Sequence, residues 1–101
     1  MTREEAEEIL FDSNPEALFL DGFDDAIIGI AERPNLGPIL AYDEQKIIDI
    51  LTEQMEPDAD DLIDREDFEV KLEMALDYYG YNIKSTWMGE NTPIIISTNF
   101  Y

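Results

Sequence analysis

The sequence lacks the two residue types on which much redox, metal and acid–base chemistry depends. None of its 101 residues is cysteine or histidine, which excludes disulfides and cysteine–zinc sites. Without histidine, the chain also lacks the usual general base and the usual pH switch. No apolar stretch is long enough to span a bilayer, and the acidic N-terminal region is unlike a signal peptide. We therefore expect a soluble, intracellular protein, and we expect it to bind no cofactor.

Basic residues are also scarce. Six lysines and arginines face 25 aspartates and glutamates, for a formal net charge of −19, whereas a magnitude of about 2–8 is enough to keep a small domain soluble. Such a charge disfavours direct binding to nucleic acid or to an anionic membrane, since both are polyanions. Three explanations remain: a basic protein partner, divalent cations, or solubility alone.

The apolar content is sufficient for folding. Hydrophobic residues make up 45% of the chain, and 11 residues are aromatic, so we expect one folded domain over residues 1–101. The order of the elements predicts an α+β fold, with a small sheet of three to five strands and about three helices packed mainly on one face. No internal repeat or low-complexity tract is visible.

Three helices are expected, over residues 2–11, 43–54 and 65–79. Thr2 and Glu5 have the spacing of a capping box, and Asp43 is placed to cap the second helix. Asp64 is the expected N-cap of the third helix, and Gly80 is expected to end that helix in the left-handed conformation. Residues 81–87 are then expected to be extended, ahead of a turn at residues 89–93.

Strands are expected at residues 17–20, 26–31, 38–42 and 94–98, because these runs are apolar and rich in branched side chains. The first two flank Asp21-Gly22-Phe23-Asp24-Asp25, whose Asp-Gly pair favours a chain reversal. We therefore predict a hairpin with an acidic tip. The three aspartates of this tip either lie in a solvated turn or converge on a metal ion; they are Asp21, Asp24 and Asp25.

The third helix has an apolar stripe at three- and four-residue spacing. A second line of apolar side chains runs beside it and either widens the core face or forms a partner surface. The stripe consists of Phe68, Leu72, Ala75, Leu76 and Tyr79, and the second line of Val70, Met74 and Tyr78.

An acidic linker, residues 55–67, precedes this helix. From Asp58 onward its acidic residues fall partly at the spacing of a calcium-binding loop. Acidic residues stand at five ligand positions of such a loop, the last of which is Glu69. However, Leu62 occupies the fifth position, and Ile63 occupies the sixth, where the tight turn needs glycine. The pattern does not indicate a calcium loop.

Three motifs together resemble a set of small acidic proteins encoded by bacteriophages. They are Asp-Gly-Phe-Asp-Asp-Ala-Ile-Ile-Gly at residues 21–29, Tyr42-Asp43 followed by Lys46, and Gly-Glu-Asn-Thr-Pro-Ile at residues 89–94. The resemblance covers about residues 17–96. It implies a phage origin and action in the cytoplasm of the bacterial host, and it implies no particular reaction.

Catalytic motifs are absent from the sequence. The serines have no histidine to activate them, and no phosphate-binding loop occurs. The best enzymatic hypothesis is magnesium-dependent phosphoryl transfer at Asp21, Asp24 and Asp25, but Arg33 and Lys46 are the only basic candidates to hold a phosphate. We expect that the protein is not an enzyme.

An interaction role accounts for more of the sequence. Carboxylates on helix faces can imitate the phosphates of duplex DNA, so we expect an inhibitor or modulator that binds a basic host or phage protein in place of nucleic acid. The alternative is a homo-oligomeric accessory protein, most simply a dimer. Tyr78, Tyr79, Tyr81 and Trp87 are aromatics that could either anchor the contact or pack in the core. The predicted partner-binding residues are Asp58, Asp60, Asp61, Asp64, Glu66, Asp67, Glu69, Glu73, Asp77 and Tyr78.

Overall fold

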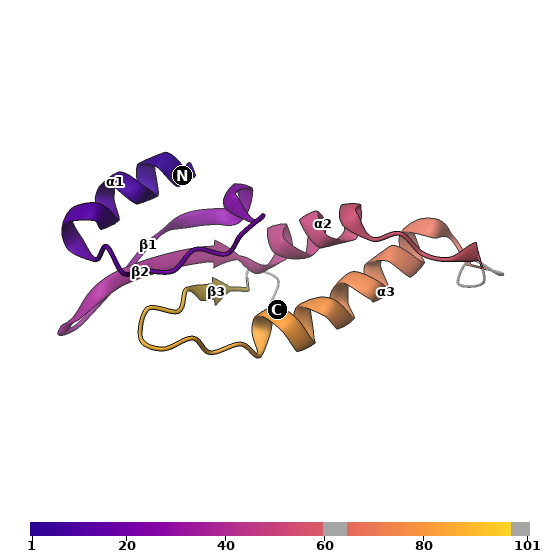
Figure 1. Cartoon of the computed structure of the whole chain (residues 1–101). Helices are drawn as coiled ribbons and strands as arrows, with labels where there is room; N and C mark the ends of the chain where they lie inside the picture. The colour runs from indigo at the N-terminus through magenta and orange to yellow at the C-terminus, as the bar shows by residue number, and fades with distance from the viewer. Residues whose placement is uncertain (60–64, 98–101) are drawn as a thin grey trace. The chain divides into compact units, whose positions relative to one another are not determined.

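The computed structural model describes residues 1–59 and 65–97 (Figure 1). Within them the chain forms three α-helices and a three-stranded sheet, which confirms the predicted α+β class. The chain divides into two compact units, Met1–Ile47 with Trp87–Tyr101 and Ile48–Thr86.

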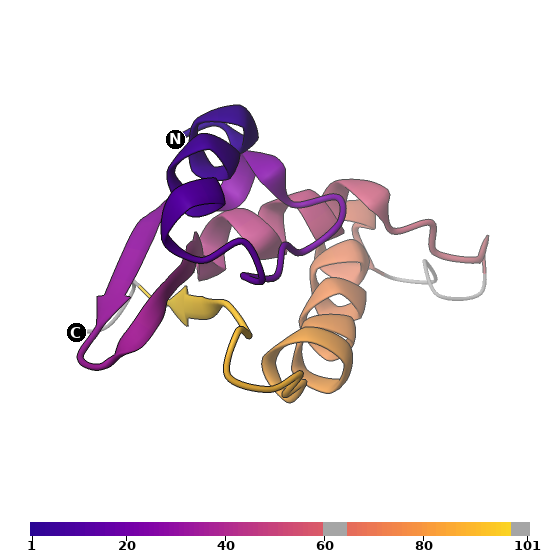
Figure 2. The same cartoon turned by 60° about the vertical axis from the view of Figure 1, so that its left-hand side comes forward.

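The first helix, α1 (Arg3–Ser13), begins at the predicted capping box. The Thr2 hydroxyl accepts from the backbone N–H of Glu5 at 3.2 Å, and the Glu5 carboxylate accepts from the backbone N–H of Thr2 at 3.1 Å. These bonds satisfy two of the donors that a helix start leaves free. The helix lies along the β1–β2 hairpin (Figures 1 and 2) and buries Ala6 and Leu10.

The hairpin joins β1 (Ile27–Arg33) to β2 (Leu36–Asp43), which run antiparallel. Its two-residue turn is Pro34-Asn35, where Pro34 fixes its own φ and Asn35 adopts a φ of 63°. Asparagine tolerates this left-handed conformation better than most residues, and the pair fits a type II turn. The strands expected at residues 26–31 and 38–42 were too short at this end, because both extend up to the turn.

The predicted hairpin around Asp21–Asp25 was also wrong. Residues 17–20 form no strand; a turn follows them, and Asp24–Ala26 forms one turn of 3₁₀-helix that leads into β1. Gly22 does adopt a positive φ, 88°, as the Asp-Gly pair indicated. The Leu20 N–H instead donates to the phenolic oxygen of Tyr42 at 2.9 Å, so this segment is attached to the sheet by a side chain and not by strand pairing.

The third strand, β3 (Ile94–Ile96), pairs in parallel with β2, and the sheet order is β1-β2-β3. The turn before it forms as predicted: Gly89 has a φ of 97°, and the Thr92 N–H donates to the carbonyl oxygen of Gly89. Two long-range bonds hold this turn. Leu18 N–H donates to the carbonyl oxygen of Asn91 at 3.1 Å, and the side-chain amide of Asn14 donates to the side-chain oxygen of Asn91 at 3.0 Å.

The second helix, α2 (Glu44–Gln54), starts directly after β2. The Asp43 carboxylate accepts from the backbone N–H of Gln45 at 3.1 Å, which confirms Asp43 as its cap. Ile47, Ile48 and Leu51 are buried, and Ile50 is half-buried.

The third helix is α3 (Asp67–Tyr79). Its N-cap residue is Glu66, whose side chain makes no capping bond. The predicted cap, Asp64, lies outside the described residues. The helix also ends differently from the prediction. Gly80 is right-handed, with φ −61° and ψ −42°, and the chain continues as a π-helix over Gly80–Lys84. The Ser85 hydroxyl donates to the carbonyl oxygen of Gly80 at 2.6 Å, so a side chain satisfies a carbonyl at the end of this segment. Residues 81–84 are therefore not extended.

The apolar stripe predicted on α3 is buried only toward its C-terminal end. Ala75 and Tyr79 are buried, whereas Phe68 is 66% and Leu76 46% exposed. In the second line, Val70 is buried and Tyr78 is 47% exposed. The burial thus follows neither predicted line completely.

Candidate interaction surfaces

Most of the few cations in this chain are bound internally. Arg3 pairs with Glu7 and Asp24, and Lys71 pairs with Asp67. Arg33 is bound differently, because its guanidinium donates to the backbone carbonyl oxygens of Gly37 and Glu90. Arg65 also pairs internally, as described below. Four of the six basic residues thus serve the fold, and few cations remain to neutralise the carboxylates at the surface.

The predicted partner-binding carboxylates that the structure describes are all exposed. On α3, Glu69, Glu73 and Asp77 form a row at four-residue spacing, about 6 Å per step. Asp60, Asp61 and Asp64 lie outside the described residues. The exposed members of the predicted set are Asp58, Glu66, Asp67, Glu69, Glu73 and Asp77.

Arg65 reduces the charge of this row. Its guanidinium lies 2.6 Å from a carboxylate oxygen of Glu73 and 3.1 Å from one of Glu69. The hydrogen bond from Arg65 holds the pKa of Glu73 below its usual value, and the two carboxylates raise the pKa of Arg65. Two carboxylates share one positive charge, so α3 is less negative at this position than its acid count indicates.

A second acidic row was not predicted as a binding surface. Glu4, Glu8 and Asp12 follow one another at four-residue spacing on α1 and are exposed. Among the described residues none of the three takes part in an ion pair, whereas their neighbour Glu7 pairs with Arg3. Like charges at this spacing repel and destabilise a helix slightly. The unbroken spacing of the three acids is visible in the sequence and could have identified the row.

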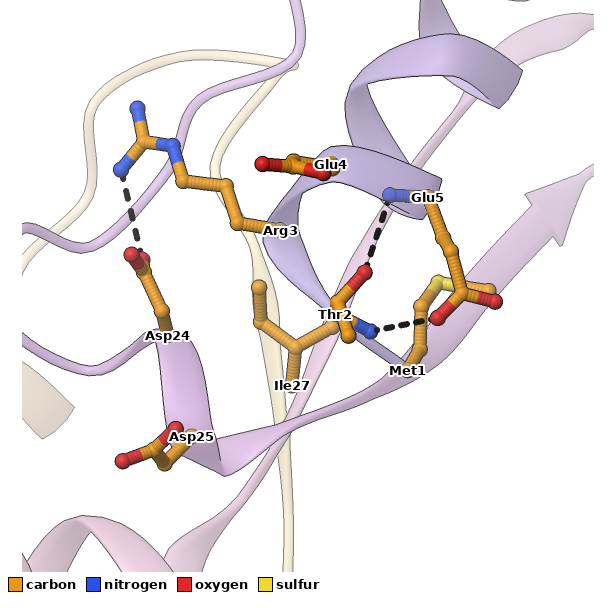
Figure 3. A pocket seen from close by; sticks show the side chains of 8 residues that line it. All are labelled: Met1, Thr2, Arg3, Glu4, Glu5, Asp24, Asp25 and Ile27. Carbon is orange, nitrogen blue, oxygen red and sulfur yellow. Dashed lines mark hydrogen bonds and ion pairs between the residues drawn. The ribbon is translucent and has the colours of Figure 1, made fainter.

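The carboxylates of the Asp21–Asp25 turn do not converge. Asp24 points to Arg3, 3.3 Å away, while Asp25 makes no contact with that guanidinium (Figure 3). Arg3 also lies over the ring of Phe19, 4.5 Å from its centroid. Across residues 1–59 and 65–97, no group of three or more acidic side chains is placed to hold a metal ion. The described geometry shows Asp24 as a link between the turn and α1.

A shallow hollow of ≈ 560 Å³ opens between the start of α1 and this turn (Figure 3). The hydrogen bonds from Thr2 hold the pKa of Glu5 below its usual value. An acidic lining of this kind favours cations over anions. The hollow is lined by Met1, Thr2, Arg3, Glu4, Glu5, Asp24, Asp25 and Ile27.

The four aromatics singled out in the sequence have different surroundings. Tyr79 is buried and belongs to the core. Tyr81 is 83% and Trp87 75% exposed, and Tyr78 is about half exposed. The three exposed rings are therefore free of the core-packing role that the sequence left open for them.

None of the described helices has the length and apolar character needed to cross a membrane. Comparison of the chain with models of protein families, with curated proteins and with solved structures found no match.

Proposed function

We propose that this chain is an acidic protein-binding module that occupies the nucleic-acid-binding surface of a basic protein. The observation that carries the proposal is the state of its cations: six basic residues face 25 acidic ones, and four of the six are bound internally. These pairs neutralise only a few of the carboxylates, so the protein still presents a strongly anionic surface.

Helices give such a surface a regular charge spacing. Acids four residues apart stand about 6 Å apart along one side of a helix, as in the row Glu4, Glu8 and Asp12 on α1. A DNA-binding groove is lined with cations that release condensed counterions when a polyanion binds. A folded protein with fixed rows of carboxylates can compete for that groove, and the bound enzyme is then inhibited.

The resemblance to small acidic phage proteins gives the proposal its setting. We place the protein in the cytoplasm of an infected bacterium, with a nucleic-acid-handling protein of the host or the phage as its partner. No catalytic role, cofactor or contact with membrane is proposed.

A homo-oligomeric accessory protein is the second candidate, and one observation favours it. In the described sheet β1 and β3 are edge strands, and Ile94 and Ile96 on β3 are 41% and 39% exposed. Such edges can pair between copies. The charge of −19 on each copy opposes self-association. Because salt screens this repulsion, self-association would strengthen at high salt, whereas binding to a basic partner would weaken.

Charge-reversal variants test the proposal. One triple variant reverses the α1 row, and a second reverses Asp58, Glu66 and Asp77; a control of equal charge change reverses Glu32, Glu53 and Glu90, which are exposed on other parts of the chain. Each tagged protein is mixed with bacterial lysate and then challenged with duplex DNA. We expect a nucleic-acid enzyme to be retained by the wild type and the control, displaced by DNA, and lost with at least one test variant. Equal retention by all the variants would contradict the proposal.

A further inference from the structure

The exposed part of α3 has a feature that charge mimicry does not use. Phe68, Leu72 and Leu76 stand four residues apart and form one ridge along the helix, about 12 Å long. Phe68 is 66% and Leu76 46% exposed, and Leu72 is half-buried. Large apolar side chains aligned in this way on a helix are typical of a surface that packs against another element.

The ridge has an acidic border. The neighbouring row is Arg65, Glu69, Glu73 and Asp77, in which the single guanidinium is held between the first two carboxylates. Over residues 65–79 five acidic side chains face two basic ones. An occupant with basic residues beside its own apolar side chains would therefore complement this face.

The same charges argue against a second copy of the chain as the occupant. Two copies of α3 would bring two acidic borders together, in a protein that carries −19 per copy. The face also offers no free main-chain groups for strand pairing, because the backbone of α3 is bonded within the helix. A partner helix, in contrast, has a groove into which a ridge of four-residue spacing packs.

We propose that the ridge Phe68, Leu72 and Leu76 is the docking site for a basic amphipathic helix of the partner protein. This inference rests on the proposed function and adds to it an apolar contact that fixes which segment of the partner is held. Apolar burial is not screened by salt as exposed charge pairs are. Binding through the ridge therefore persists at a salt concentration that removes most of the purely ionic attraction.

The test uses two synthetic 18-residue peptides with the same leucine and lysine content. In one, the leucines recur at three- and four-residue spacing and form a stripe on a helix; in the other their order is scrambled. Each is titrated calorimetrically into the full chain at ~100 mM and ~500 mM salt. The double variant Phe68→Ser/Leu76→Ser removes the ridge, and Phe11→Ser is the matched control, since Phe11 is 76% exposed on α1. Circular dichroism checks that all the variants remain folded.

We expect the striped peptide to bind at least ~10-fold more tightly than the scrambled one. The double variant abolishes that difference, and Phe11→Ser keeps it. Equal binding of both peptides, unchanged in the double variant, would overturn the ridge as a docking site and leave the acidic module intact. A concentration-dependent dimer of the wild type that the double variant dissociates would overturn it in favour of a second copy. Failure of both peptides to bind would also overturn the ridge, whereas the proposed function is decided separately by displacement with DNA.

Discussion

Replacing Tyr42 with phenylalanine should weaken the attachment of the segment that carries the Asp21–Asp25 turn. Tyr42 is fully buried on β2, opposite Ile27 and Ile95 of the adjacent strands. Its phenolic oxygen accepts the Leu20 N–H at 2.9 Å. Phenylalanine keeps the ring and its packing, so the variant isolates the hydrogen bond.

The expected loss of stability follows from the Leu20 N–H, which the substitution leaves without its acceptor. A buried donor without its partner costs about 1–3 kcal/mol, and Leu20 is half-buried, so water can reach part of it. We expect a loss of ~1–2 kcal/mol, or a fall of about 4–16 °C in Tm for a domain of this size. Thermal and urea unfolding followed by circular dichroism measure it, with Tyr81→Phe as the control, because Tyr81 is 83% exposed.

The pH dependence provides an independent check. Burial raises the pKa of Tyr42, and the hydrogen bond from Leu20 opposes this only in part. A raised pKa in the folded state means that the stabilising contribution of neutral Tyr42 is complete below the unfolded pKa of about 10 and is lost as pH rises through the folded value. The stability gap between wild type and Tyr42→Phe should narrow above pH ~10. Equal Tm values at pH 7 and an unchanged gap at high pH would refute the reasoning.

Three further substitutions, one of them a control, test the packing of the hairpin and the ion pairs of α3. Gly37→Ala places a Cβ 2.9 Å from Cγ of Asn14, and urea unfolding should show a loss of stability of about 1–3 kcal/mol. Gly29→Ala is the control and should change stability little, because no atom lies within 4 Å of its added Cβ. Equal losses of stability in the two variants would contradict this prediction. Arg65→Gln should raise the pKa of Glu73 toward 4.5, since Arg65 lowers it. The stability that this ion pair contributes is present above pH ~4.5 and is lost as pH falls through the lower pKa that Glu73 has in the folded state. The free energy of unfolding of Arg65→Gln should therefore depend less on pH in this acidic range. An unchanged pKa of Glu73, followed by NMR, would contradict the prediction.

Local signals in the sequence predicted the starts of α1 and α2 well, whereas α3 begins at Asp67 and not at residue 65. Thr2 with Glu5 and Asp43 act as caps because a capping bond spans only two or three residues, and no distant contact is needed to form it. The two strands of the hairpin were predicted, but their ends next to Pro34 and Asn35 were missed. The two prolines and the glycine of residues 33–38 are as typical of a loop as of a tight hairpin turn.

Predictions that depended on distant contacts were less accurate. Residues 17–20 resemble a strand locally, yet the Leu20 N–H is satisfied by Tyr42, 22 residues away. Gly80 was expected to end α3, but the Ser85 hydroxyl satisfies its carbonyl and the helix continues. Phe68 belongs to the predicted apolar stripe and is nevertheless 66% exposed, because periodicity identifies a stripe without showing how much of its length is covered.

The candidate surfaces likewise combine features that local sequence predicts with features that depend on contacts between more distant residues. The exposure of the predicted acids follows from composition, since so few cations are available to pair with them. The pairing of Arg65 with Glu73, eight residues along, could not be read from four-residue spacing alone. The row Glu4, Glu8 and Asp12 could have been recognised in the sequence, because its only requirement is helical spacing without an intervening base.

Capture from bacterial lysate followed by elution with duplex DNA tests the central claim most directly. The tagged protein is incubated with lysate at ~100 mM salt, washed, and eluted either with DNA or with an equal charge concentration of polyglutamate, and the eluates are identified by mass spectrometry. We predict that DNA releases one nucleic-acid enzyme more effectively than polyglutamate does, because the protein occupies a groove shaped for the duplex. Recovery of the protein alone, or release of the same set of proteins by both polyanions, would contradict the claim.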